Sequence, residues 1–251
     1  MYVKRGFGTM SWLERTGGKL AWWDRLNYVC QGIRLSLASR RRAGIWLPMR
    51  DLHEIIPPDT PVTREAFALC EDISPPFLLN HCLRAYFWAR LLDDDTRPFD
   101  DEALFAACLL HDFGLCEHHR GSMEVGRCFT AEGAKEAAAL ALRHGWPDQR
   151  AAIVADAIAL HLNILVGEQH GKEAQMLRTG SGADTAGLRL QSLSQEHIDH
   201  IVERYPRLDL KKQLSTLLEK NAQAHPCSRI GLMMRKFHFG GLIRNNPYFQ
   251  E

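Results

Sequence analysis

The sequence lacks the features that mark several large classes of protein. No apolar run is long enough to cross a bilayer, and the first six residues are not followed by the apolar segment of a secretory signal. Internal repeats, low-complexity segments and strands of alternating apolar and polar residues are also absent. We therefore expect a cytoplasmic globular protein that is built from helices.

Cysteine is present without a recognisable pattern. The seven cysteines are odd in number and include no Cys-x-x-Cys pair, so neither a disulfide framework nor a zinc ribbon is indicated. We expect reduced thiols, most of them in the core, because free cysteine is among the most buried residue types. Cys82 and Cys116 stand near the candidate metal ligands described below and are candidates to reach the same pocket.

Two short segments resemble nucleotide-binding motifs but do not match them in full. Residues 180–187 are rich in glycine, but they lack the spacing and the lysine of a phosphate-binding loop, and no strand precedes them. The triplet Asp112, Phe113 and Gly114 matches a kinase motif, yet the chain has neither the glycine-rich loop nor the catalytic-loop signature of a kinase. No organic cofactor is predicted.

The composition fits a protein with one large core and an uneven charge. The 251 residues are 45% hydrophobic and 24% charged, with a formal net charge of +1, and a chain of this length can bury a substantial core. Residues 1–50 contain ten lysines and arginines against only Glu14 and Asp24. This region therefore has a local charge of +8, which leaves about −7 for the rest of the chain.

An amphipathic helix is predicted within this basic region. Its apolar residues recur at helical spacing and precede a run of three arginines, 40–42. We expect the helix to dock its Trp and Leu face on the rest of the protein and to leave its arginines in water. The alternative is contact with a membrane surface or with nucleic acid. The apolar residues are Trp22, Leu26, Val29, Cys30, Ile33 and Leu37.

Two candidate metal ligands are adjacent in the chain. His111 and Asp112 follow the apolar run 104–110, which indicates a buried helix, and Gly114 can end that helix. Adjacent side chains on a helix point apart, but a helix end relaxes this restriction, so both side chains can turn towards one cation. Imidazole nitrogen and carboxylate oxygen are ordinary ligands of zinc, iron and manganese.

Three further candidates stand on other predicted helices. The pattern of residues 77–92 places His81 on the inward face of a helix, and His161 stands at the end of a helix predicted from residue 148. Asp184 lies in the glycine-rich stretch, from which another helix is expected to run. A single inward histidine is more often a hydrogen-bonded core residue than a ligand, so the metal interpretation depends on the whole set.

This ordered set resembles the HD superfamily of metal-dependent phosphohydrolases and related enzymes. The resemblance covers roughly residues 45 to 250 and implies a multi-helix, all-α fold. It also implies that His81, His111, Asp112 and Asp184 hold a divalent metal ion, with zinc preferred and iron or manganese as alternatives. The local segments look like the cyanamide hydratase-like branch; they are residues 79–86, 111–114, 129–134, 157–161, 182–184 and 205–207.

The resemblance divides the chain into three parts. Residues 1–58 are expected to form a basic N-terminal helical extension and a linker. Residues 59–209 are expected to form the HD metal-binding domain, and residues 210–251 a C-terminal helical tail that packs on it. Association into a homo-oligomer is compatible with this arrangement.

An enzyme that uses a metal-activated water is the function that the resemblance implies. A divalent ion can lower the pKa of bound water from about 15.7 towards roughly 7. The first hypothesis is hydration or hydrolysis of a small nitrile-like substrate, such as cyanamide to urea. His161 is the first candidate to move protons in the pocket. Glu117 and His118, in the polar segment 115–122, are further candidates for this role.

Three alternative functions stay open. The first is a phosphomonoesterase or nucleotide phosphohydrolase, which would need arginines such as Arg84, Arg120 or Arg127 to hold phosphate; the alternative for Arg84 is a structural role on its helix. Leu115 stands where the nucleotidase branch commonly has a glutamate. The second is a two-iron oxygenase, although residues 129–133 lack the histidine that such enzymes usually carry. The third is a non-catalytic binding module that uses the basic N-terminal region.

Overall fold

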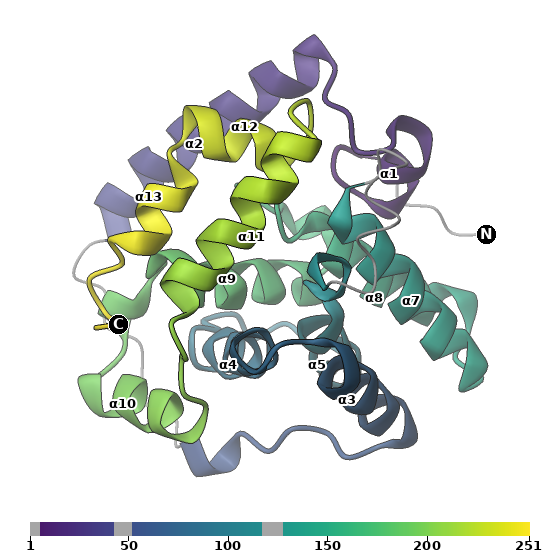
Figure 1. Ribbon diagram of the computed structural model, residues 1–251. Helices are drawn as coiled ribbons and strands as arrows, with labels where there is room; N and C mark the ends of the chain where they lie inside the picture. Colours follow the sequence, from purple (N-terminus) through teal and green to yellow (C-terminus); the bar gives the residue numbers. More distant parts are fainter. Residues whose placement is uncertain (1–5, 43–51, 117–127) are drawn as a thin grey trace.

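The computed structural model describes residues 6–42, 52–116 and 128–251, and the side chains of the first range up to residue 35. Every regular element in these ranges is a helix, so the predicted all-α fold is confirmed (Figure 1). The twelve α-helices of the described ranges are α1 (Met10–Thr16), α2 (Trp22–Arg42), α3 (Pro61–Ile73), α4 (Pro76–Leu91), α5 (Asp101–Leu110), α7 (Phe129–Arg143), α8 (Asp148–Leu160), α9 (Lys172–Ala186), α10 (Gln195–Arg204), α11 (Leu210–Ala224), α12 (Arg229–Lys236) and α13 (Phe239–Arg244).

Helices α4, α5, α8 and α9 form the centre of the molecule, with α3 and α7 packed beside them (Figure 1). Every residue from Ala103 to Leu110 of α5 is buried, as expected of a helix that is apolar on all sides. Helices α4 and α9 cross closely because Gly180 has no side chain. A Cβ atom at Gly180 would lie 2.0 Å from the carbonyl oxygen of Ala85 in α4.

Capping side chains mark the starts of several helices. Thr60 and Thr63 form a reciprocal capping box at the start of α3. The Asp100 carboxylate accepts a hydrogen bond from a backbone N–H of the first turn of α5. The Ser194 hydroxyl accepts from the backbone N–H of His197 at the start of α10.

The C-terminal helices lie against the central ones. Helix α11 contacts α4, and α13 contacts the end of α9. The division of the chain into residues 1–58, 59–209 and 210–251 stays a prediction. Among the described residues, no helix combines the length and the apolar character that a membrane span requires.

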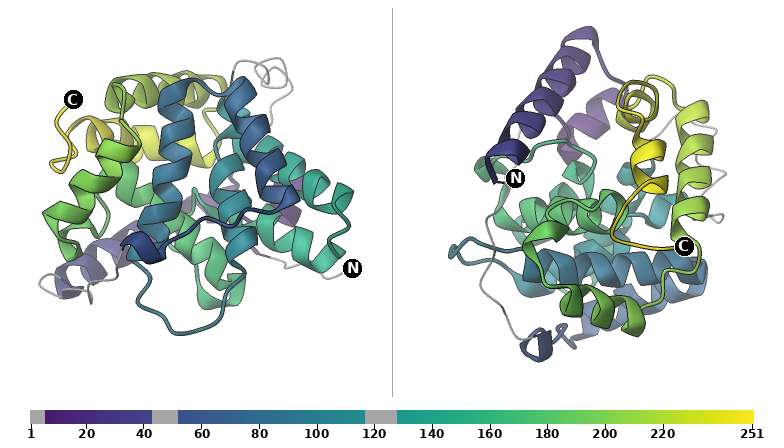
Figure 2. Two further views of the ribbon diagram at one scale, coloured as in Figure 1. Left: turned by 90° about the horizontal axis from the view of Figure 1, so that it is seen from below. Right: turned by 90° about the vertical axis from the view of Figure 1, so that its left-hand side faces the viewer.

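Helix α2 runs along an outer edge of the molecule (Figures 1 and 2). Its Tyr28 is fully buried, and the Tyr28 hydroxyl donates a hydrogen bond to the carbonyl oxygen of Leu162. By contrast, Trp22 is 69% exposed, and Leu26 and Ile33 are each 58% exposed. The prediction that this Trp and Leu face docks on the protein is therefore wrong. Helical spacing shows which residues share a face, but it does not show which face is covered.

Candidate metal centre

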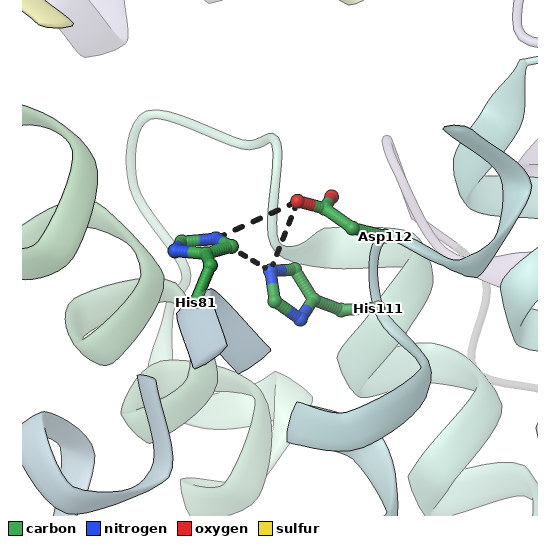
Figure 3. Close-up of side chains that lie close together, drawn as sticks. All are labelled: His81, His111 and Asp112. Carbon is green, nitrogen blue, oxygen red and sulfur yellow. Dashed lines mark hydrogen bonds and ion pairs between the residues drawn. The ribbon is translucent and has the colours of Figure 1, made fainter. Parts of the chain in front are cut away.

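Three buried side chains, one from α4 and two from the end of α5, lie close together (Figure 3). His81 projects from the middle of α4, while His111 and Asp112 directly follow the last residue of α5. The chain leaves the helical conformation at Asp112 (φ −104°, ψ 9°), which lets the two neighbouring side chains face one point. His81 Nε2 lies 3.2 Å from His111 Nε2, and both atoms lie 3.5 Å from Asp112 Oδ2.

His161 reaches the same carboxylate from the end of α8. Its Nε2 atom lies 3.6 Å from Asp112 Oδ1. His81 and His111 have no exposed surface, Asp112 is 5% exposed and His161 is 8% exposed. Burial lowers the pKa of His111 and lowers the pKa of His161 to about 3. Both imidazoles are therefore neutral at neutral pH.

The Nδ1 atoms of all three histidines are already hydrogen-bonded. His111 and His161 each donate from Nδ1 to the backbone carbonyl oxygen three residues earlier, at 2.7 Å. His81 Nδ1 donates to a carboxylate oxygen of Asp184, also at 2.7 Å. Because carbonyl and carboxylate oxygens only accept, each Nδ1 carries a ring proton, and in the neutral form of each ring Nε2 presents a lone pair. These bonds fix the tautomer and the orientation of each ring.

The lone pairs of the three Nε2 atoms therefore point towards the Asp112 carboxylate, which is itself an acceptor. None of the described N–H or O–H groups donates to that carboxylate. The carboxylate also stands at the C-terminal end of α5, where the helix dipole disfavours negative charge. A bound cation would satisfy all four groups at once.

The separations of these atoms fit such an ion. Zinc bonds of about 2.0–2.1 Å in a tetrahedral site place ligand atoms about 3.3–3.4 Å apart. The three distances among His81 Nε2, His111 Nε2 and Asp112 Oδ2 are 3.2, 3.5 and 3.5 Å. The donor set therefore fits a divalent metal ion of borderline softness.

Asp184 lies on the opposite side of His81 from this cluster. Its Oδ2 accepts from His81 Nδ1, and its two oxygens accept from Arg84 at 2.7 and 2.8 Å. Trp88 Nε1 and Arg207 donate to Oδ1 at 2.9 and 3.1 Å. Burial opposes ionisation, but the Arg84 and Arg207 charges outweigh it and hold the pKa of Asp184 well below its usual value.

In this arrangement Asp184 orients His81, as carboxylates behind metal-bound histidines commonly do. A direct bond from Asp184 to the metal stays a prediction. The expectation that a helix runs onward from the glycine-rich stretch is wrong, because α9 ends there and Gly187 caps it in the left-handed conformation (φ 71°). Arg84 is fully buried, and besides Asp184 it donates hydrogen bonds to the backbone carbonyl oxygens of residues 205 and 206.

A cavity of about 220 Å³ includes Asp112 and His161 in its wall. Arg178 is the one lysine or arginine among the described residues that line it. Most of the remaining wall is apolar and comes from α9, α11, α12, α13 and the segment after α8; it includes Leu162, Ile164, Leu188, Leu214, Met233 and Phe237. The cavity therefore offers an apolar enclosure beside the polar cluster.

The remaining site predictions have different outcomes. Glu117 and His118 lie outside the described residues, as do Arg120 and Arg127. Cys82 Sγ lies 3.8 Å from His111 Nδ1, on the side of the ring away from Asp112. The Cys116 thiol is within 3.4 Å of the Ser74 hydroxyl. Neither cysteine is among the described residues that line the cavity.

Sequence reasoning missed two of the arginines that hold the site in place, Arg207 and Arg229. Arg229 is fully buried and donates to Ala159 O at 2.7 Å and to Asn163 Oδ1 at 2.8 Å, on either side of His161. Nothing in its local sequence distinguishes it from a surface arginine. Arg207 stands in a segment that the family resemblance had singled out, so the signal for its role was available.

Comparison with known proteins gives one finding on family. A family model described as HD domain matches residues 78–207, about half of the chain. The matched span contains His81, the His111 and Asp112 pair, His161 and Asp184. The comparison with curated proteins found no match.

Proposed function

The chain belongs to the HD-domain family, whose members are generally metal-dependent hydrolases, and we propose that it hydrates or hydrolyses a small uncharged substrate. The substrate class that we propose is the nitriles, with cyanamide, which would give urea, as the first to test. Zinc is the metal that we propose, with iron and manganese as alternatives.

The observation that carries the proposal is the convergence of the Nε2 atoms of three histidines on the Asp112 carboxylate. His81, His111 and Asp112 would hold the metal ion, and Asp184 would keep the His81 ring in its orientation. When bound, a divalent ion makes water a better nucleophile near neutral pH and polarises the group under attack.

His161 is the residue that we propose for proton transfer. It lines the cavity, and its Nε2 lone pair faces the cluster because Nδ1 donates to a backbone carbonyl oxygen. Burial lowers its pKa to about 3, so the ring is neutral before the reaction, and its protonated form would be a strong acid that passes the proton on readily. The proton that water loses on attacking the nitrile carbon would pass to His161 Nε2 and then to the substrate nitrogen.

The apolar cavity supports an uncharged substrate over a phosphate ester. Arg84, the phosphate-binding candidate that the structure describes, is fully buried and bonded to Asp184. Leu115, where a nucleotidase would have a glutamate, is buried as well. Arg178 in the cavity wall is the observation that keeps a phosphomonoester as the second candidate.

The proposal can be tested with metal-stripped protein reconstituted separately with zinc, iron(II) and manganese. Bound metal is quantified first. Each metal-loaded form is then assayed for urea from cyanamide, for amides from a panel of small nitriles, and for phosphate released from p-nitrophenyl phosphate. We expect Asp112→Asn to lose both metal and activity. Asp101→Asn, at the other end of α5 and bonded to Tyr86, should retain both.

Two results would count against different parts of the proposal. Protein that binds none of the three metals would overturn the metal site itself. Metal-loaded protein that turns over neither cyanamide nor any nitrile would overturn the substrate class, and release of phosphate would then favour the second candidate.

A further inference from the structure

Exposed apolar side chains are concentrated on α2. Nine large apolar residues are exposed in the described part of the chain, and five of them are on this helix. Trp22, Leu26, Val29 and Ile33 follow one another at intervals of four, three and four residues, so they share one helical face. Trp23 stands beside them, with its ring centroid 5.2 Å from that of Trp22. We call these five residues the α2 stripe.

The orientation of α2 is set by contacts on its other side. The buried Tyr28 ring packs against Phe7 and Phe237, with centroid distances of 5.9 and 6.0 Å. Gly32 lets the Phe237 ring approach, since a Cβ atom there would lie 2.6 Å from it. Rotating the helix to bury the α2 stripe would expose Tyr28 and break its hydrogen bond to Leu162. The stripe therefore faces outwards because the fold holds it there.

Two arginines flank the α2 stripe. Arg25 and Arg34 are exposed on the same helix, at positions on either side of the stripe. The first 50 residues have a net charge of +8, whereas the remaining residues have about −7. A helix with tryptophan and aliphatic residues on one face and cations beside it has the character of a helix that lies in a membrane interface.

We propose that the α2 stripe binds the surface of an anionic membrane, with its apolar side chains among the lipid headgroups and Arg25 and Arg34 on lipid phosphates and carboxylates. Tryptophan suits this position because its ring is apolar and its indole N–H is polar. The attraction of the basic region to anionic lipid adds to the apolar burial and is weakened by salt. This proposal does not depend on the reaction that the site performs.

Two other occupants fit the stripe less well. Nucleic acid is bound chiefly through cations on its phosphates, which would leave Leu26 and Ile33 in water. A second copy of the chain would cover the stripe, but it would also bring two regions of positive net charge together, and like charges oppose such pairing.

The test is co-sedimentation of the full chain with vesicles of phosphatidylcholine alone or mixed with phosphatidylserine. We expect binding to the mixed vesicles that weakens as salt is added. Leu26→Gln combined with Ile33→Gln should lower that binding by about tenfold or more. Arg25→Gln combined with Arg34→Gln should lower it and reduce its salt dependence. The matched control is Leu142→Gln with Leu208→Gln, which changes side chains that are 47% and 48% exposed elsewhere and should leave binding unchanged.

Several outcomes would overturn the proposal. One is the absence of binding to phosphatidylserine vesicles, and another is unchanged binding by the Leu26→Gln and Ile33→Gln variant. A dimer in sedimentation that this variant disperses, without vesicle binding, would assign the stripe to a second copy. Binding to a DNA duplex that only the arginine variant loses would assign the region to nucleic acid. Thermal unfolding of each variant checks that it is folded.

Discussion

The centre of the helical bundle and the surface of α2 depart from the usual distribution of side chains in opposite ways. At the centre, His81, Arg84 and Asp184 are completely buried, although charged groups are costly to remove from water. On α2, Trp22 and Leu26 are mostly exposed. The buried charges are compensated within the chain, because four side chains donate to Asp184. No such compensation within the described residues covers the α2 stripe, and the membrane contact that we propose would cover it.

The largest effect should come from breaking the buried pair. Arg84→Met would leave the Asp184 carboxylate with fewer donors in the interior, and the loss of one partner of a buried pair costs about 3–5 kcal/mol in the free energy of unfolding. Unfolding in urea measures this change in the free energy of unfolding. Arg64→Met is the matched control, because Arg64 pairs with Asp59 at 3.3 Å with both side chains mostly exposed. That change should cost about 0–1 kcal/mol. Equal costs would remove the energetic distinction between the two environments.

Metal addition should give the next largest effect. Zinc at about a hundredfold above its Kd would stabilise the stripped protein by about 2.7 kcal/mol, because the ion binds only the folded cluster. Thermal unfolding with and without zinc measures this. Asp112→Asn should abolish the zinc effect and yet stabilise the stripped protein by about 1 kcal/mol, since an amide N–H can donate to a histidine Nε2 where a carboxylate cannot. Destabilisation of the stripped protein by this variant would show that Asp112 already has a donor.

Breaking a half-buried ion pair should cost less than breaking the buried Arg84–Asp184 pair and at least as much as breaking the exposed Arg64–Asp59 pair. Arg150 donates to the Asp100 carboxylate at 2.6 and 3.0 Å. Partial burial raises the pKa of Asp100, but the bonds from Arg150 and the Ala103 N–H outweigh it and hold the pKa below its usual value. Asp100→Asn keeps the helix cap and loses the pair, so it should cost about 1 kcal/mol at neutral pH.

The pH dependence of this cost has a defined sign. A carboxyl group with a lowered folded-state pKa contributes its stability above the unfolded value of about 3.9 and loses it as the pH falls through the folded-state pKa. The difference in free energy of unfolding between wild type and Asp100→Asn should therefore be constant near neutral pH and shrink below about pH 4. A difference that grows on acidification would contradict the assignment.

The smallest effect on stability should come from the α2 stripe. Leu26→Gln with Ile33→Gln should change the free energy of unfolding by less than about 0.5 kcal/mol, because exposed side chains contribute little to folding. Tyr28→Phe on the opposite face should cost about 1 kcal/mol, since it removes the donor to the buried Leu162 carbonyl oxygen. A large destabilisation by the stripe variant would mean that the stripe supports the fold rather than a partner.

Several elements were predictable because they depend on local pattern. The apolar run before His111 indicated a buried helix, and α5 is buried throughout. Ser194 stands directly before α10, where serine is a common cap, and its hydroxyl accepts from the backbone N–H of His197. The order of His81, His111 and Asp112 indicated a shared site, and the HD-domain family match spans these residues.

By itself, the sequence determined the all-α class, the family and which residues share a helical face, because these depend on residue order and spacing along one chain. Only the tertiary structure decided that Asp184 meets His81 at Nδ1, since this depends on how closely α9 crosses α4 at Gly180. It also decided that α2 turns Tyr28 inwards and Trp22 outwards. A helical pattern defines a face, but the contacts of that face belong to residues distant in the sequence.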